Sequence, residues 1–401
     1  MQHGFDSRSP GVYFLVRKPL PIFMDLSKIM VPKPHLKAIR IAISCVSVAM
    51  AFCGLARADD GNSLHIYNFS QNIAPGTIEK FEKETGIKVT YDVYDSDDTL
   101  MTKLLAGGSD YDIVVPSNNY FAKEKEAGIF AKIDLSKLSK LKNLDPQIVE
   151  LIKANDPKGE YGVPYIWGIT GIAYNITEVK KRVGADAPLD SWDMIFDPKW
   201  AGKLKSCGLS LQDNGGETFQ DALFGAKLNP DTTDPKDFKV ALQTLKAIRP
   251  SITQFSSNSY IDDLAGGDIC AAVAYSGDAQ TAKLQAKAAG RKFELTFVIP
   301  KEGAPLWVDM FAIPAASSHK ENATKFIDFM LRPDIAAAQT NELKYPTSVG
   351  AARPLIDPKI INDTAIYPLP QDMKRVIMEK PLPIAVMRQI NRDYLELKAG
   401  R

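Results

Sequence analysis

A tryptophan and an acid stand two residues apart in one apolar stretch of the chain. Residues 306–313 predict a buried strand bounded by Pro and Gly, and Asp309 is the single acid inside it. Side chains two apart on a strand share a face, so Trp307 and Asp309 point the same way. An aromatic plate beside a negative charge suits an organic cation. The alternative is that Asp309 pairs with a Lys or Arg and Trp307 fills the core, and this strand alone leaves both open.

Two more acids lie close to the end of a predicted strand or the start of a predicted helix. Residues 268–275 predict another buried strand, which ends in Tyr275 and is followed by a serine and by Asp278. Glu217 falls in the first turn of a helix predicted after residues 212–216. An acid at that position also complements the helix dipole without binding anything, so the role of Glu217 stays open between the two.

The N-terminal part of the mature chain alternates between strand and helix patterns. Strands are predicted at 63–68, 87–94 and 111–117, and helices at 77–84 and 98–106. This alternation is typical of a parallel, doubly wound α/β sheet, in which ligands bind beyond the carboxyl ends of the strands. Those ends carry aromatic and hydrogen-bonding groups, namely Phe69, Ser70, Gln71 and Ser117. Neither a G-x-G-x-x-G nor a Walker phosphate loop occurs.

Two crossings of the chain predict two lobes. The first lies near Gly168, where strand 163–167 ends and strand 169–175 begins, and the second leads into strand 306–313. The predicted lobes comprise residues 59–168 with 304–354, and residues 169–303 with 355–401. Residues 371–398 are predicted to be mostly helix that closes the second lobe. Two lobes joined by crossing strands can hinge about a cleft.

The first 58 residues are predicted to form an N-terminal extension and a secretory signal peptide. Three basic residues precede the apolar run 41–56, which ends in an A-x-A site that predicts cleavage after Ala58. The alternatives are a retained anchor, or a lipoprotein that uses Cys53. The true start of the chain lies either at Met1 or at Met30, since residues 2–29 have no role in a signal.

Cleavage changes the charge balance. It removes eight of the 49 Lys and Arg residues and two of the 48 Asp and Glu residues, which leaves 41 basic against 46 acidic side chains. A mildly acidic chain without basic clusters argues against nucleic acid or an anionic membrane surface as a partner.

Cysteine usage fits an exported protein. Of the four cysteines, Cys207 and Cys270 remain after cleavage, and two cysteines in an exported chain suggest one disulfide. The alternative is two buried free thiols.

The sequence contains little that indicates an enzyme. The mature chain keeps His65 and His319, neither with metal-ligand spacing, and it has no G-x-S-x-G elbow. We therefore expect neither an enzyme nor a metal or cofactor, and the alternative is a secreted hydrolase of an amine or amide.

A recognisable set of segments runs in order over nearly the whole mature chain, at residues 64–68, 81–89, 111–117, 143–146 and 301–303. Together these segments resemble the periplasmic putrescine- and spermidine-binding proteins of polyamine ABC transporters. The segments around Cys207 and Cys270 resemble the putrescine-binding branch, in which the two cysteines form a disulfide. The resemblance implies a two-lobed periplasmic-binding-protein fold of type II. Each lobe would be a mainly parallel sheet flanked by helices, with the ligand cleft between the lobes.

The resemblance also assigns roles around a ligand. It makes Tyr275, Trp307 and Tyr345 aromatic walls for the methylenes. It makes Glu217, Asp278 and Asp309 the acceptors of the ammonium groups. Ser70 and Ser117 would hydrogen-bond the amine or its waters, beside Phe69 and Gln71 of the first loop. A cation over an aromatic face contributes about 0.5 to 2 kcal/mol.

The expected protein is a periplasmic monomer that hands a polyamine to an inner-membrane ABC transporter. The first loop departs from the family pattern, because Gln71 stands where an acid is usual and Asn72 where a tyrosine is usual. Putrescine or a related diamine is the expected ligand, and spermidine or another organic cation is the alternative.

Overall fold

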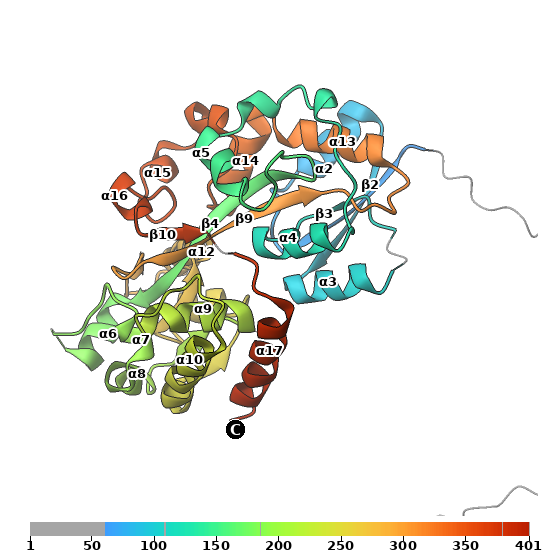
Figure 1. The fold of residues 1–401 in the computed structure, drawn as a ribbon. Helices are drawn as coiled ribbons and strands as arrows, with labels where there is room; N and C mark the ends of the chain where they lie inside the picture. Colours follow the sequence, from blue (N-terminus) through green and yellow to red (C-terminus); the bar gives the residue numbers. More distant parts are fainter. Residues whose placement is uncertain (1–60, 108–109, 185, 379, 401) are drawn as a thin grey trace, which may run out of the picture. The chain divides into compact units, whose positions relative to one another are not determined.

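The computed structural model describes residues 61–107, 110–184, 186–378 and 380–400 (Figure 1). The predicted extension, the signal with its cleavage after Ala58, the alternative start at Met30 and the lipoprotein site at Cys53 lie outside these residues. Within them, no helix combines the length and the apolar character that crossing a membrane requires.

One mixed sheet of ten strands runs through the described part of the chain. The strands are β1 (Ser63–Phe69), β2 (Lys88–Tyr94), β3 (Ile113–Val114), β4 (Gly162–Asn175), β5 (Leu209–Leu211), β6 (Gln254–Phe255), β7 (Ala271–Tyr275), β8 (Leu295–Val298), β9 (Ala304–Ala312) and β10 (Val376–Met378). Their order is β2-β1-β3-β9-β4-β7-β5-β6, with β10 paired to β9 and β8 paired to β4. Strand β1 is parallel to β2 and β3, and β5 is parallel to β6 and β7. The long strands β4 and β9 are antiparallel to each other between these two parallel sets.

Helices flank both parallel sets of strands (Figure 1). The α-helices are α2 (Thr77–Thr85), α3 (Asp97–Leu105), α4 (Asn118–Glu126), α5 (Pro146–Ile152), α6 (Ile176–Val183), α7 (Asp193–Phe196), α8 (Pro198–Leu204), α9 (Gly215–Gly225), α10 (Pro235–Ile248), α11 (Tyr260–Gly266), α12 (Ser276–Ala288), α13 (Lys320–Met330), α14 (Pro333–Leu343), α15 (Pro358–Ile361), α16 (Pro370–Met373) and α17 (Ile384–Lys398). Short 3₁₀ turns are η2 (Leu135–Lys137), η3 (Leu141–Asn143), η4 (Arg249–Ser251) and η5 (Gly350–Leu355). Helices α5, α8, α10 and α15 each begin with an Asp that caps the helix and a Pro in the first turn. An Asp side chain accepts a free backbone N–H there, and Pro fixes the first helical φ without losing a needed donor.

Strand β4 is continuous where the sequence predicted a break near Gly168. Its first part pairs with β9 as far as Ile169, and its second part pairs with β7 from Thr170 onward and with β8. Gly168 does not end the strand. A Cβ at Gly168 would lie 2.3 Å from Cζ2 of Trp307 on β9, so the glycine admits the indole ring. The prediction of two separate strands was wrong because this glycine serves a close approach between strands.

The apolar side chains gather in clusters on the two parallel sets. Clusters that include Ile66, Phe81 and Phe311 lie around β1 and β9, and clusters that include Trp192 and Phe219 lie around β5 and β7. Helix α17 packs against α9 and α10 and buries four side chains: Val386, Ile390, Tyr394 and Leu397.

The lobe boundaries stay a prediction. Residues from position 355 onward are assigned to the second lobe. Among them, Ile356, Ile360 and Ile366 pack in the cluster around β1 and β9, in the part of the fold assigned to the first lobe. Strand β10 pairs with β9.

The prediction of mostly helix over residues 371–398 was wrong between the end of α16 at Met373 and the start of α17 at Ile384. Residues 376–378 form strand β10, and α17 begins at Ile384. Pro381 and Pro383 lie between them. Proline lacks the N–H that an internal helical bond needs and disfavours helix for the residue before it, so a helix cannot run through this segment.

The disulfide is confirmed. Cys207 precedes β5 and Cys270 precedes β7, and their sulfurs are bonded with the Cα atoms 5.4 Å apart. The bond therefore ties two neighbouring parallel strands at their amino ends. The alternative of two free thiols was wrong.

Candidate ligand-binding site

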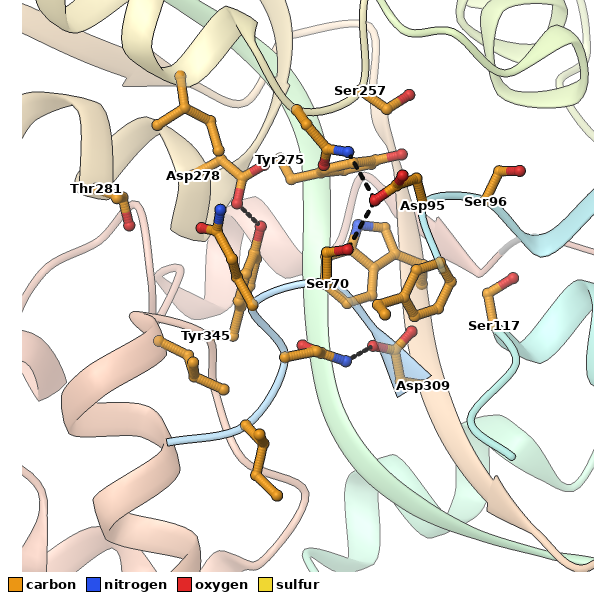
Figure 2. Close-up of a pocket in the computed structure, with 18 of the residues that line it drawn as sticks. Ser70, Asp95, Ser96, Ser117, Ser257, Tyr275, Asp278, Thr281, Asp309 and Tyr345 are labelled. Carbon is orange, nitrogen blue, oxygen red and sulfur yellow. Dashed lines mark hydrogen bonds between the residues drawn. The ribbon is translucent and has the colours of Figure 1, made fainter. Parts of the chain in front are cut away.

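A single pocket of about 420 Å³ brings together every residue predicted to bind a ligand. These residues are Phe69, Ser70, Gln71, Ser117, Glu217, Tyr275, Asp278, Trp307, Asp309 and Tyr345. Figure 2 shows several of them around the pocket, with strand β4 passing behind. Phe69 and Tyr275 are the last residues of β1 and β7, as expected for a site beyond the carboxyl ends of parallel strands.

Three aromatic rings form one wall of the pocket. The rings of Tyr275 and Tyr345 meet the Trp307 indole edge to face, with centroids 5.6 Å and 5.2 Å from it. A second glycine makes room for this wall, since a Cβ at Gly277 would lie 2.6 Å from the Tyr345 ring. The wall offers a flat apolar surface to an alkyl chain or to a cation.

Asp309 lies in the middle of β9 and is 5% exposed. Its Oδ2 accepts a hydrogen bond of 2.9 Å from the side-chain amide of Asn72. Desolvation raises the Asp309 pKa well above its usual value, the Asn72 hydrogen bond lowers it, and the nearby Asp97 and Glu217 raise it further. No described Lys or Arg lines the pocket around Asp309 or contributes to its pKa shift, so the alternative of a basic partner was wrong.

Glu217 and Asp278 are held by phenols. Tyr275 donates its hydroxyl to Glu217 Oε2 at 2.6 Å. Tyr260 donates to Asp278 Oδ2 at 2.6 Å, and Tyr345 donates to Asp278 Oδ1. Desolvation raises the Glu217 pKa to about 7 and the Asp278 pKa to about 6, and the phenol hydrogen bonds oppose both shifts. Both acids therefore titrate close to neutral pH while no cation is bound.

The sequence patterns did not single out two acids that follow β2, Asp95 in the loop and Asp97 at the start of α3. Asp97 accepts the Ser117 hydroxyl at 2.7 Å and the Ser117 backbone N–H at 3.0 Å, which fixes the end of β3. Asp95 accepts the hydroxyl of Ser70 at 2.7 Å (Figure 2). It also accepts the side-chain amide of Asn258 at 3.2 Å. Both acids line the pocket. They follow the predicted strand 87–94 directly, so the rule that selected Ser70 and Ser117 also applies to them.

The charges on the pocket wall have one sign. Its lining contains six acids, Asp95, Asp97, Glu217, Asp278, Asp309 and Glu342, and no Lys, Arg or His from the described part of the chain. Over residues 61–107, 110–184, 186–378 and 380–400, no group of three His, Cys, Asp or Glu side chains is arranged to hold a metal ion. Four of the six acids, all except Asp95 and Glu342, are buried or half-buried. Because no described Lys or Arg lines the pocket beside them, an organic cation is favoured as the missing counter-charge.

The sequence matches the family model described as bacterial extracellular solute-binding protein over residues 76–368. The chain belongs to this family. It is 44% identical over 356 residues to the putrescine-binding periplasmic protein SpuD of Pseudomonas aeruginosa, a match that covers 89% of this chain and 97% of the relative. It is 41% identical over 346 residues to the putrescine-binding periplasmic protein PotF of Escherichia coli, which covers 86% of this chain and 93% of the relative.

A solved structure gives the same assignment. The spermidine/putrescine ABC transporter substrate-binding protein PotD from Streptococcus pneumoniae superposes with a TM-score of 0.70 at 26% identity, over 84% of this chain and 99% of that one. The predicted α/β fold is thereby confirmed as the type II fold of periplasmic binding proteins. This family member is a periplasmic solute receptor and not an enzyme.

Proposed function

We propose that this protein captures a polyamine in the periplasm, with putrescine or a related diamine preferred, and delivers it to an ABC transporter in the inner membrane. The observation that carries the proposal is the pocket in which Glu217, Asp278 and Asp309 have no described basic partner. The names of the relatives SpuD and PotF point to the same ligand. In this proposal the receptor acts as a monomer.

The proposed pose matches each part of the ligand to one kind of side chain. The ammonium groups bind the carboxylates of Glu217, Asp278 and Asp309, and the methylenes lie against Trp307 and the two tyrosines beside it. Phe69 and Gln71 border the ligand from the first loop, and Ser70 and Ser117 hydrogen-bond the amine or its waters. Charge-assisted hydrogen bonds are stronger than neutral ones, so the three acids supply most of the selectivity for amines over neutral solutes.

Binding closes the cleft between the two proposed lobes, 59–168 with 304–354 and 169–303 with 355–401. Two hydrogen bonds would hold the closed state, because each joins residues that these boundaries assign to different lobes. Tyr345 donates to Asp278, and Asn258 donates to Asp95. Small-angle scattering should show a smaller radius of gyration with saturating ligand than without it, and an unchanged radius would contradict the closure.

A longer polyamine such as spermidine is the second candidate. The pocket carries further acids, Asp95 and Glu342, beyond the three that two ammonium groups need. Gln71 is neutral where the family usually has an acid. Asp95 and Glu342 offer charge to a third amino group, and calorimetry with putrescine and with spermidine distinguishes a diamine from a triamine receptor.

The decisive experiment is calorimetry on the mature chain after a thermal-shift screen. Putrescine, cadaverine and spermidine are compared with amino acids and sugars. At least one amine should bind and raise the melting temperature, while neutral sugars should not. Asp309→Asn keeps the shape of the side chain and removes its charge, and it should cost on the order of 3 to 5 kcal/mol of amine binding. Equal binding of amines by Asp309→Asn and the wild type would contradict the proposed site.

A further inference from the structure

The loop between β1 and α2 places one side-chain amide directly on the central acid of the pocket. Asn72 is 6% exposed, and its Nδ2 donates to Asp309 Oδ2 at 2.9 Å. The other oxygen, Asp309 Oδ1, accepts no hydrogen bond from the described residues, and Asp309 lines the pocket. One oxygen is thus anchored, while the other remains available to a ligand.

Neighbouring groups fix the amide of Asn72 in this orientation. Its backbone carbonyl accepts the hydroxyl of Tyr165 at 3.0 Å and the side-chain amide of Asn68 at 3.2 Å. Its Nδ2 also lies 3.3 Å from Asn68 Oδ1. If the amide were reversed, its oxygen would face two other oxygens, those of Asp309 and Asn68. The network therefore leaves Asn72 in one role, that of a hydrogen-bond donor to Asp309.

We propose that Asn72 is a positioning residue for cation binding, which anchors the Asp309 carboxylate with one oxygen free for the ligand. The inference deepens the proposed function and rests on it for the identity of the ligand. Asn72 does not need to touch the ligand for this role. It acts through Asp309, and its loss should change how Asp309 is ionised as well as how tightly the ligand binds.

The electrostatic setting explains why Asp309 depends on one donor. Asp97 on α3 and Glu217 on α9 face it as like charges, and Tyr94 and Tyr165 are the phenols that interact with it. Burial and the two acids favour the protonated carboxyl, and the Asn72 hydrogen bond favours the ionised carboxylate. Removing that donor should raise the pH at which Asp309 ionises, so that a binding cation must displace a proton over a wider pH range.

The test compares Asn72→Ala and Asn72→Asp with the surface control Asn362→Ala. Asn72→Asp keeps the shape, cannot donate when ionised and adds a like charge beside Asp309. Calorimetry from pH 6 to 8.5 follows putrescine or whichever polyamine the wild type binds. We expect Asn72→Ala to weaken binding about tenfold at pH 7 and to raise the midpoint of the pH profile by about one unit, because one pKa unit corresponds to a factor of ten. Asn72→Asp should weaken binding more, and Asn362→Ala should match the wild type.

A double-mutant cycle separates positioning from a general loss of structure. In an Asp309→Asn background, Asn72→Ala should change affinity less than twofold if it acts through the carboxylate. An equal loss in both backgrounds would overturn the inference. So would an unchanged pH midpoint in a folded Asn72→Ala protein.

A ligand-free measurement keeps this inference distinct from the proposed function. Carbon-13 NMR of the aspartate carboxyls can follow the titration of Asp309, identified by its absence in Asp309→Asn. Asn72→Ala should raise the Asp309 pKa even if no polyamine binds, in which case only the proposed function fails. An unchanged Asp309 pKa in Asn72→Ala would refute the role of Asn72, whatever the ligand is.

Discussion

Lowering the pH should weaken ligand binding steeply. Without a cation, desolvation holds the pKa of Glu217 at about 7 and that of Asp278 at about 6. A bound ammonium favours the ionised form of each carboxylate, so it lowers both pKa values. Binding must therefore release protons wherever the free protein carries them, and the affinity falls as the pH drops through 7 and then through 6.

The size of the effect follows from the two pKa values. At pH 5 the Glu217 pKa lies about two units above the solution pH, and the Asp278 pKa lies about one unit above it. Each unit costs about 1.4 kcal/mol of binding free energy, so the two acids together cost about 4 kcal/mol. The affinity at pH 5 should then be on the order of a thousandfold weaker than at pH 8. Protonation of Asp309, whose pKa is also raised, adds to this loss.

Calorimetry at pH 5, 6, 7 and 8 measures the change directly. Repeating each titration in two buffers with different ionisation enthalpies counts the protons released. We expect proton release to be largest below pH 7 and to vanish near pH 8, except for any proton held by Asp309. Glu217→Gln provides the matched comparison, because its pH dependence should be flatter although its binding is weaker throughout. A dissociation constant that changes less than about fivefold between pH 8 and pH 5 would refute the reasoning, because it would mean that these carboxylates do not exchange protons for the ligand.

Three substitutions test other parts of the site and the fold. Gln71→Asp should strengthen putrescine binding by about 1 to 3 kcal/mol, as expected for an added charged hydrogen-bond acceptor, and calorimetry showing no gain would contradict this account of specificity. Gly168→Ala places a Cβ 2.3 Å from the Trp307 ring, so it should cost about 1 to 3 kcal/mol of stability and also weaken ligand binding. The control Gly202→Ala, whose Cβ has no neighbour within 4 Å, should neither destabilise the protein nor weaken binding. Denaturant unfolding and ligand titrations measure the two effects. Replacing Cys207 and Cys270 by Ser removes a disulfide that joins positions 63 residues apart, and it should lower the free energy of unfolding by roughly 4 kcal/mol. Equal urea midpoints for the variant and the wild type would exclude that contribution.

The local pattern was enough to predict several parts of the site. The period of two along residues 306–313 placed Trp307 and Asp309 on one face, and β9 has that face on the pocket. Export left two cysteines, so the disulfide had one possible pairing within the mature chain. The carboxyl ends of β1 and β7 supplied Phe69 and Tyr275 by a rule that depends on strand direction alone.

Other features could be decided only by the tertiary structure. The partner of Asp309 is Asn72, which lies 237 positions away in the sequence, and one of the two partners of Asp95 is Asn258, 163 positions away. As a glycine, Gly168 indicated the end of a strand, yet it lies inside β4, where the Trp307 ring from β9 packs against it. Periodicity and caps report on contacts within one turn or one strand, and so they determine which face of an element is apolar and where that element begins. Which donor meets a buried carboxylate, and which side chain needs the space above a glycine, depends on how distant strands are paired, and this pairing is set by the packing of the whole core.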